Sequence, residues 1–214
     1  MLRIQTNQLK WYLYMNIHYY LIEIMDTIEI SGVLGLIAMV VLTLNIVMGI
    51  LLSTAYKKNA YWQKLPDKIK ALKIIDFHNN TAYVALLIVF LHFIIIPLDP
   101  NSKFNFTHLL KPLTAPHQPL FVLLGVISFI AILIVVITTQ KVIKNKLGTT
   151  TWRNIHVISY ATGLLFIVHG LVMDPLLKDR PIDFIDPEKL LVEACALLLL
   201  AAFIFRYKYK ISKK

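Results

Sequence analysis

Two apolar runs that each carry two histidines constrain this chain more than any other feature. The histidines are His78 and His92 in residues 74–96, and His156 and His169 in residues 152–173. Thirteen residues separate the first pair and twelve separate the second. Runs of this length and hydropathy predict helices that span a membrane. Because ionisable side chains are costly inside a membrane, four histidines at matching depths indicate a function.

Other apolar runs also approach the length of a membrane span. Of the 214 residues, 57% are hydrophobic and 16% are charged, with a mean hydropathy of +0.67. We therefore predict an all-α integral membrane protein rather than a soluble domain. The five clear spans are residues 31–53, 74–96, 119–139, 152–173 and 190–205. The aromatic stretch at 11–29 predicts either a sixth, short transmembrane helix or a helix lying in the interface.

The net charge of +10 comes from basic residues that flank the spans, and membrane orientation explains it. We therefore expect no nucleic-acid partner. Basic residues number six in 57–73, four in 141–153 and five in the tail from 206, against two in 97–118 and three in 174–189. By the positive-inside rule the first three segments are cytoplasmic. We expect a multi-pass protein of the plasma membrane with a cytoplasmic C-terminus. Both histidine spans then enter from the cytoplasm and run parallel.

This topology predicts two histidine pairs. At 1.5 Å per residue, the histidines of one span lie roughly 20 Å apart, near the two edges of a hydrocarbon core about 30 Å thick. We expect His78 to face His156 at the cytoplasmic side, and His92 to face His169 at the outer side. Each pair suits the two axial positions of a haem iron. The bundle would then enclose two stacked haems.

One geometric point argues against this arrangement. His78 and His92 fall on nearly the same face of an ideal helix, whereas His156 and His169 fall more than 90° apart. Helix tilt, or a distortion near Ser159 or Gly163, would be needed to bring both of these rings opposite the other histidine span. The plain alternative is that each histidine is a hydrogen-bonded packing residue.

Three other residues inside or beside the spans have simpler interpretations. Ser31 is placed to cap the span that follows it. Asn45, at the middle of that span, is expected to bond a neighbouring helix, or alternatively a cofactor edge. Cys195 lies in an apolar run, where it forms no internal disulfide and favours no thiolate chemistry.

Haem propionates need donors, and candidates lie at both edges. They are Lys73, Trp152 and Arg153 at the cytoplasmic edge, and His108, Lys111, His117 and Gln118 at the outer edge. The alternative for each is interfacial anchoring or ordinary topology charge. His108 and His117 also leave open a site for an incoming metal ion.

These features resemble the ferric-reductase-like transmembrane domain, the bis-haem core shared by ferric reductases and NADPH oxidases. The similar stretches are SGVLGLIAMVVLTLNIVMGILLST, PHQPLFVLLG and KLGTTTWRNIHVISYATGLLFIVHG, together with the two histidine spacings. The latter half also resembles the haem-binding membrane subunit that serves the periplasmic methionine sulfoxide reductase. The resemblance implies two b haems on the four histidines. We accordingly divide the chain into an N-terminal helix (1–29), a transmembrane haem domain (30–207) and a basic tail (208–214).

The resemblance also implies transmembrane electron transfer to an acceptor on the outer face. No glycine-rich dinucleotide fingerprint occurs, so we expect the haem-carrying membrane component of an oxidoreductase that lacks its own flavin and NAD(P)H domain. The donor would be a separate flavoprotein or a quinol in the bilayer. The acceptor would be ferric iron, oxygen or a redox protein. The alternatives are a proton or metal-ion transporter that uses the intramembrane histidines, and a purely structural subunit.

Overall fold

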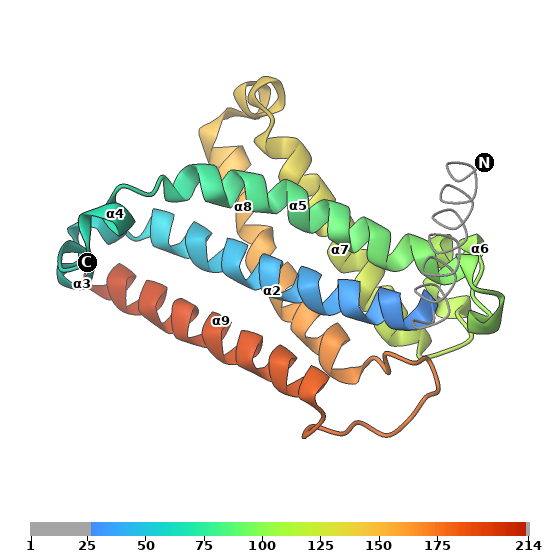
Figure 1. Ribbon diagram of the computed structural model, residues 1–214. Helices are drawn as coiled ribbons and strands as arrows, with labels where there is room; N and C mark the ends of the chain where they lie inside the picture. The colour runs from blue at the N-terminus through green and yellow to red at the C-terminus, as the bar shows by residue number, and fades with distance from the viewer. Residues whose placement is uncertain (1–26, 213–214) are drawn as a thin grey trace, which may run out of the picture.

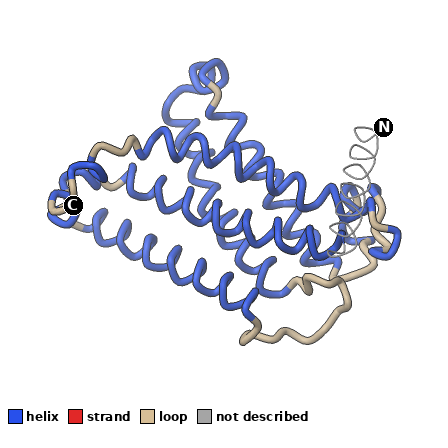
Figure 2. The backbone as a smooth tube through the Cα atoms, in the orientation of Figure 1, coloured by secondary structure: helices blue, strands red, loops and turns tan. Residues whose placement is uncertain are grey.

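The computed structural model describes residues 27–212, so the predicted N-terminal helix falls almost wholly outside the described residues. Within them every regular element is a helix (Figure 2). Five helices are long and apolar enough to span a membrane. They are α2 (Thr27–Ser53), α5 (Ile74–Ile95), α7 (Pro119–Thr139), α8 (Lys141–Val172) and α9 (Pro187–Ile211). The prediction of an all-α membrane protein with five clear spans is confirmed.

The start of α2 differs from the prediction. The helix begins at Thr27, and Ser31 lies inside it with a fully buried side chain, so the prediction that Ser31 caps the helix is wrong. Glu29 in the first turn favours the earlier start, because a carboxylate there complements the helix dipole. Ile28 packs into a small apolar cluster with Phe104 and Leu177 and holds the first turn in place.

Proline and short polar side chains set the other helix ends. Pro119 is the first residue of α7, as predicted, and Pro187 is the first of α9. The Asp186 side chain accepts from the backbone N–H of Glu188 and so caps α9. As a result α9 begins three residues earlier than its apolar run indicates.

Short helices fill the connections at both ends of the bundle. Between α2 and α5 lie η1 (Tyr56–Lys58), α3 (Ala60–Gln63) and α4 (Asp67–Lys70). Between α5 and α7 lie η2 (Ile96–Leu98), η3 (Pro100–Ser102), α6 (Phe106–Leu110) and η4 (Pro112–Thr114). The lysine-rich connection with α3 and α4 lies beside the end of α9, at the left in Figure 1. We call this the basic end, and we call the opposite end, with α6 and the 173–186 loop, the acidic end.

Helix α2 lies at the centre of the bundle. It runs between α5 and α9, with α8 crossing behind it (Figure 1). Its buried positions include Leu42, Ile46 and Ile50, which join the main apolar core with residues of every other long helix. Helix α5 is thereby fixed against α2, and α8 against both α7 and α9.

The oblique course of α8 resolves the problem of its histidine phase. The one non-helical residue within α8 is Gly148, with φ of 76°, where a short first segment turns into the long span. Residues 149–172 stay helical, so no distortion occurs at Ser159 or Gly163. The span instead crosses α2 obliquely (Figure 1), and both of its histidine rings lie beside a histidine ring of α5.

Candidate functional site

The four span histidines meet in two pairs, each joining α5 to α8. His78 and His156 have ring centroids 6.0 Å apart and planes at 68°. His92 and His169 have centroids 6.4 Å apart and planes at 84°. The structure therefore brings together the pairs that the sequence indicated, the first toward the basic end and the second toward the acidic end.

Three of the four imidazoles are oriented by a backbone carbonyl. A carbonyl oxygen only accepts, so Nδ1 of each ring donates, and Nε2 keeps its lone pair for a metal. The three bonds run from His78 to the Asn45 carbonyl (3.0 Å), from His92 to that of Ser31 (2.7 Å) and from His169 to that of Phe121 (2.8 Å). This is the arrangement that commonly fixes the tautomer of a metal-ligating histidine.

The fourth imidazole has a different environment. His156 lies over the Trp152 ring, with centroids 5.2 Å apart and planes at 32°. Its Nδ1 is buried, and so is the indole Nε1 of Trp152, and neither has a hydrogen-bond partner within residues 27–212. Lys144 places its ammonium 3.9 Å from the centre of the same indole.

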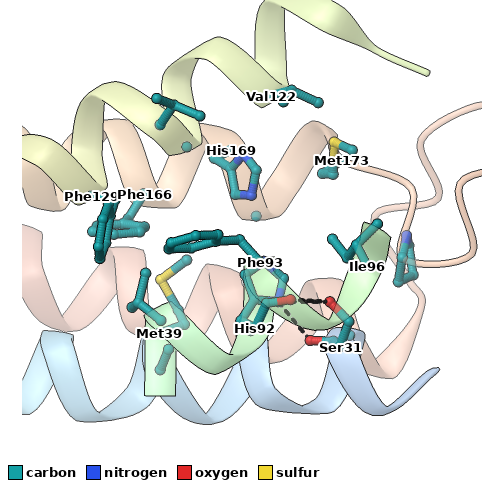
Figure 3. A pocket seen from close by; sticks show the side chains of 18 of the residues that line it. Ser31, Met39, His92, Phe93, Ile96, Val122, Phe129, Phe166, His169 and Met173 are labelled. Carbon is teal, nitrogen blue, oxygen red and sulfur yellow. Dashed lines mark hydrogen bonds between the residues drawn. The ribbon is translucent and has the colours of Figure 1, made fainter. Parts of the chain in front are cut away.

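A cavity of about 560 Å³ opens between His92 and His169. Figure 3 shows the two rings facing each other across it. Apolar side chains form most of the wall, among them Met39, Phe93, Phe129, Phe166 and Met173. A large apolar cavity with a few convergent nitrogen donors has the size and chemistry of a cofactor site.

The donor set fits a flat macrocycle better than a bare ion. Each pair supplies two imidazoles on opposite sides of a gap, and no group of three or more histidines, cysteines or carboxylates that suits a metal ion occurs among the described residues. A protein-bound zinc takes four ligands. Haem already supplies four nitrogens and needs two more from the protein, which is what each pair offers.

None of the four outer-edge candidates lines the cavity, and three of them are engaged with other protein groups. The Gln118 amide donates to the Val172 carbonyl, and its oxygen accepts from the N–H of Asp174, which ties the start of α7 to the end of α8. His117 meets Asp179 at 2.7 Å. His108 closes a capping box at the start of α6. The structure thus does not bring His108 and His117 into one metal site.

The candidates at the basic end are less engaged. Lys73 precedes α5 and Arg153 lies on α8, and both are exposed. Neither side chain forms an ion pair within the described part of the chain. Asn45 holds the same region together, because its amide donates to the His78 carbonyl (2.6 Å) and to the Thr81 hydroxyl (2.8 Å). The predicted interhelical role of Asn45 is confirmed.

Two residues that line the cavity have roles that the sequence analysis did not predict: Ser31, which it assigned as a helix cap, and Lys189. The Ser31 hydroxyl donates to the His92 carbonyl at 2.7 Å and lies 3.1 Å from Nδ1 of the same ring. Lys189 is buried, and its ammonium donates to the carbonyls of Gly170 (2.9 Å) and Met173 (2.7 Å) at the end of α8. The available signal in the sequence was the position of Lys189, immediately before an apolar run.

A tight loop closes the acidic end next to this lysine. Asp174 is buried and accepts from the guanidinium of Arg180 and from the backbone N–H groups of Leu176, Lys178 and Arg180. Burial alone would raise the pKa of the Asp174 carboxyl, but these hydrogen bonds outweigh burial and hold that pKa well below its ordinary range. The carboxylate in turn raises the pKa of Arg180.

The comparison with protein families agrees with this geometry. A family model described as "Ferric reductase like transmembrane component" matches residues 34–167. The matched segment covers more than half of the chain and contains three of the four span histidines, ending two residues before His169. No curated protein and no solved structure matches the chain.

Proposed function

Because the chain belongs to the ferric reductase-like transmembrane components, we propose that it conducts electrons across a membrane through two b haems. Membership of this family indicates transmembrane electron transfer in general. The finer proposal is that His78 and His156 hold an inner haem, and that His92 and His169 hold an outer one. The distance between the two ring centroids of each pair is the observation that supports this proposal.

An imidazole nitrogen bonds a metal at about 2 Å, so two rings on opposite sides of one iron have centroids about 6 Å apart. The observed separations are 6.0 and 6.4 Å. Along α5 the two pairs are fourteen residues apart, which is roughly 20 Å of helix. Both the spacing within a pair and the spacing between pairs therefore support two haems in one bundle.

When bound, each of the two haems would act as a one-electron carrier. The protein's own part is to place and isolate them. Carbonyl-bonded imidazoles present Nε2 to the iron, and the packed core of α2, α5 and α8 excludes water between the sites. The two histidine pairs would leave no ligand position open on either iron, so donors and acceptors would exchange electrons at the haem edges.

The charge distribution supports an orientation of the protein in the membrane. The lysine-rich basic end belongs in the cytoplasm, so we infer a multi-pass protein of the plasma membrane with a cytoplasmic C-terminus. Electrons would enter at the inner site from a separate flavoprotein or a quinol in the bilayer. They would leave from the outer site to ferric iron, oxygen or a redox protein. Lys73 and Arg153 are placed to meet the propionates or the donor at the inner edge.

The test is the haem content of the detergent-purified protein, measured by pyridine haemochrome assay with oxidised and reduced spectra. About two b haems per chain with a low-spin reduced spectrum are expected, since each pair fills both axial positions. Protein without haem, from cells supplied with it, would sink the proposal and favour the proton or metal-ion transporter.

The pair assignment has its own test. His92→Ala or His169→Ala is expected to remove the outer haem and to spare most of the inner one. His108→Ala is the matched control, because that histidine lies on α6 outside both pairs. Equal loss of both haems in His92→Ala would contradict the assignment.

A further inference from the structure

The three carbonyls that orient the imidazoles share a local sequence pattern. Each belongs to a residue that stands four positions before a glycine in the same helix. The pairs are Ser31 with Gly35, Asn45 with Gly49, and Phe121 with Gly125. In a helix the side chain of a residue leans back over the turn that precedes it, so a glycine leaves the carbonyl four residues earlier uncovered.

Each of these glycines lies directly against its imidazole. A Cβ added at Gly35 would meet Cε1 of His92 at 3.0 Å, and one at Gly125 would meet Cε1 of His169 at 2.9 Å. At Gly49 the distance to Cε1 of His78 would be 3.1 Å. An alanine would therefore push the ring away from the carbonyl. We call each carbonyl–glycine pair a notch.

The spacing of the notches matches the spacing of the histidines. Gly35 and Gly49 are fourteen residues apart on α2, as are His78 and His92 on the antiparallel α5. Since both helices have the same rise per residue, equal spacing places one notch opposite each ring. The repeat is thus a property of the α2–α5 pair rather than of either helix alone.

The same register on α7 leads to a different residue. Gly125 faces His169, and His156 precedes His169 by thirteen residues, so the matching position on the antiparallel α7 is Thr138. Thr138 has a side chain where a notch requires a glycine, and its hydroxyl donates to the Val135 carbonyl at 2.9 Å. A fourth notch is absent, in agreement with the unpartnered Nδ1 of His156.

We propose that the three notches position three of the axial histidines, and that His156, which has none, makes the inner haem the more weakly held of the two. This rests on the haem ligation of the proposed function. Loss of a hydrogen-bond partner of a ligating histidine typically lowers metal affinity by about 10–100-fold. The glycines act through the histidines and are positioning residues.

The first experiment measures haem retention and the low-spin EPR signals of purified alanine variants. Gly35→Ala and Gly125→Ala are expected to shift or remove the outer haem's signal and leave the inner one. Gly49→Ala should do the reverse. Gly163→Ala is the crowded control, since Gly163 does not line the cavity and its Cβ would meet the flexible end of Ile46 at 2.7 Å.

Loss confined to one haem supports the notches even where the variant folds less well, because the other haem reports on the fold. Equal effects on both haems, or effects no larger than in Gly163→Ala, overturn them. A wild-type protein without haem would instead refute the proposed function, and is recognised before any variant is made.

The second experiment follows transfer of haem to excess apomyoglobin. His169→Ala retains the inner haem alone and His156→Ala the outer haem alone, so the two loss rates are measured separately and compared with the phases of the wild type. Inner-haem loss about 10-fold faster or more is expected from the missing hydrogen bond. Equal rates, or a faster outer haem, overturn the role of His156.

Discussion

Lys189 is the residue whose environment in the structure differs most from the one that its sequence position suggests. In the sequence it follows a connection with five acidic residues and suggests one more interfacial charge, yet the side chain is buried against the end of α8. Two of its three N–H donors bond the carbonyls of Gly170 and Met173, which no helical N–H satisfies. Within residues 27–212 the third donor has no partner, and Lys189 lines the cavity.

We predict that Lys189→Met loosens the end of α8 and the outer site with it. The change leaves two carbonyls without their partner, which costs about 1–3 kcal/mol. Thermal unfolding of the purified protein and retention of the outer haem are the measurements. Lys178→Met, at an exposed position of the same loop, is the control. An unchanged unfolding temperature and full outer-haem content in Lys189→Met would contradict the capping role.

Asp174 predicts a pH dependence at the acidic end. Its pKa in the folded protein lies below the ordinary value of 3.8, so its contribution to stability is full above about pH 4 and is lost as the pH falls further. Hydrogen bonds to a charged group are worth about 2 kcal/mol. Asp174→Asn should therefore lower the unfolding temperature at pH 7 and flatten the loss of stability below about pH 4. The idea fails if wild type and variant show the same pH profile.

At the scale of elements, α8 has the most demanding geometry. Its histidines fall on different faces of an ideal helix, and they meet α5 at both ends because the span crosses α2 obliquely. Gly148 separates the first turns after α7 from the long span. Its φ of 76° and ψ of 160° lie in a region open essentially to glycine alone.

We predict that Gly148→Ala destabilises the α7–α8 connection by about 1–3 kcal/mol through backbone strain. A Cβ at this position would meet nothing within 4 Å, so a steric clash contributes nothing. Gly32→Ala on α2, where the backbone is helical, provides the control. Thermal unfolding measures both variants, and equal stability of the two would show that the conformation at Gly148 is not required.

At the scale of the whole molecule, hydropathy and charge predict the five spans and the parallel course of the two histidine helices. Long apolar runs leave few alternatives to a helix in a membrane. The sequence could not show the notches, because glycines fourteen residues apart acquire meaning only once α2 packs antiparallel on α5. Ser31 was misassigned for a related reason. A serine at the edge of an apolar run is typical of a cap, and its bond to His92 spans 61 positions.

The last prediction concerns electron transfer across the membrane by the whole molecule. In proteoliposomes with ferricyanide inside and dithionite outside, wild-type protein is expected to bleach the ferricyanide absorbance faster than protein-free vesicles do. His78→Ala and His92→Ala should each fall to the rate of protein-free vesicles, because removing either carrier leaves roughly 20 Å of hydrocarbon without one. His108→Ala, with both pairs intact, should retain the wild-type rate. Full transfer in His92→Ala would contradict a path that needs both sites, even if both haems were present in the wild type.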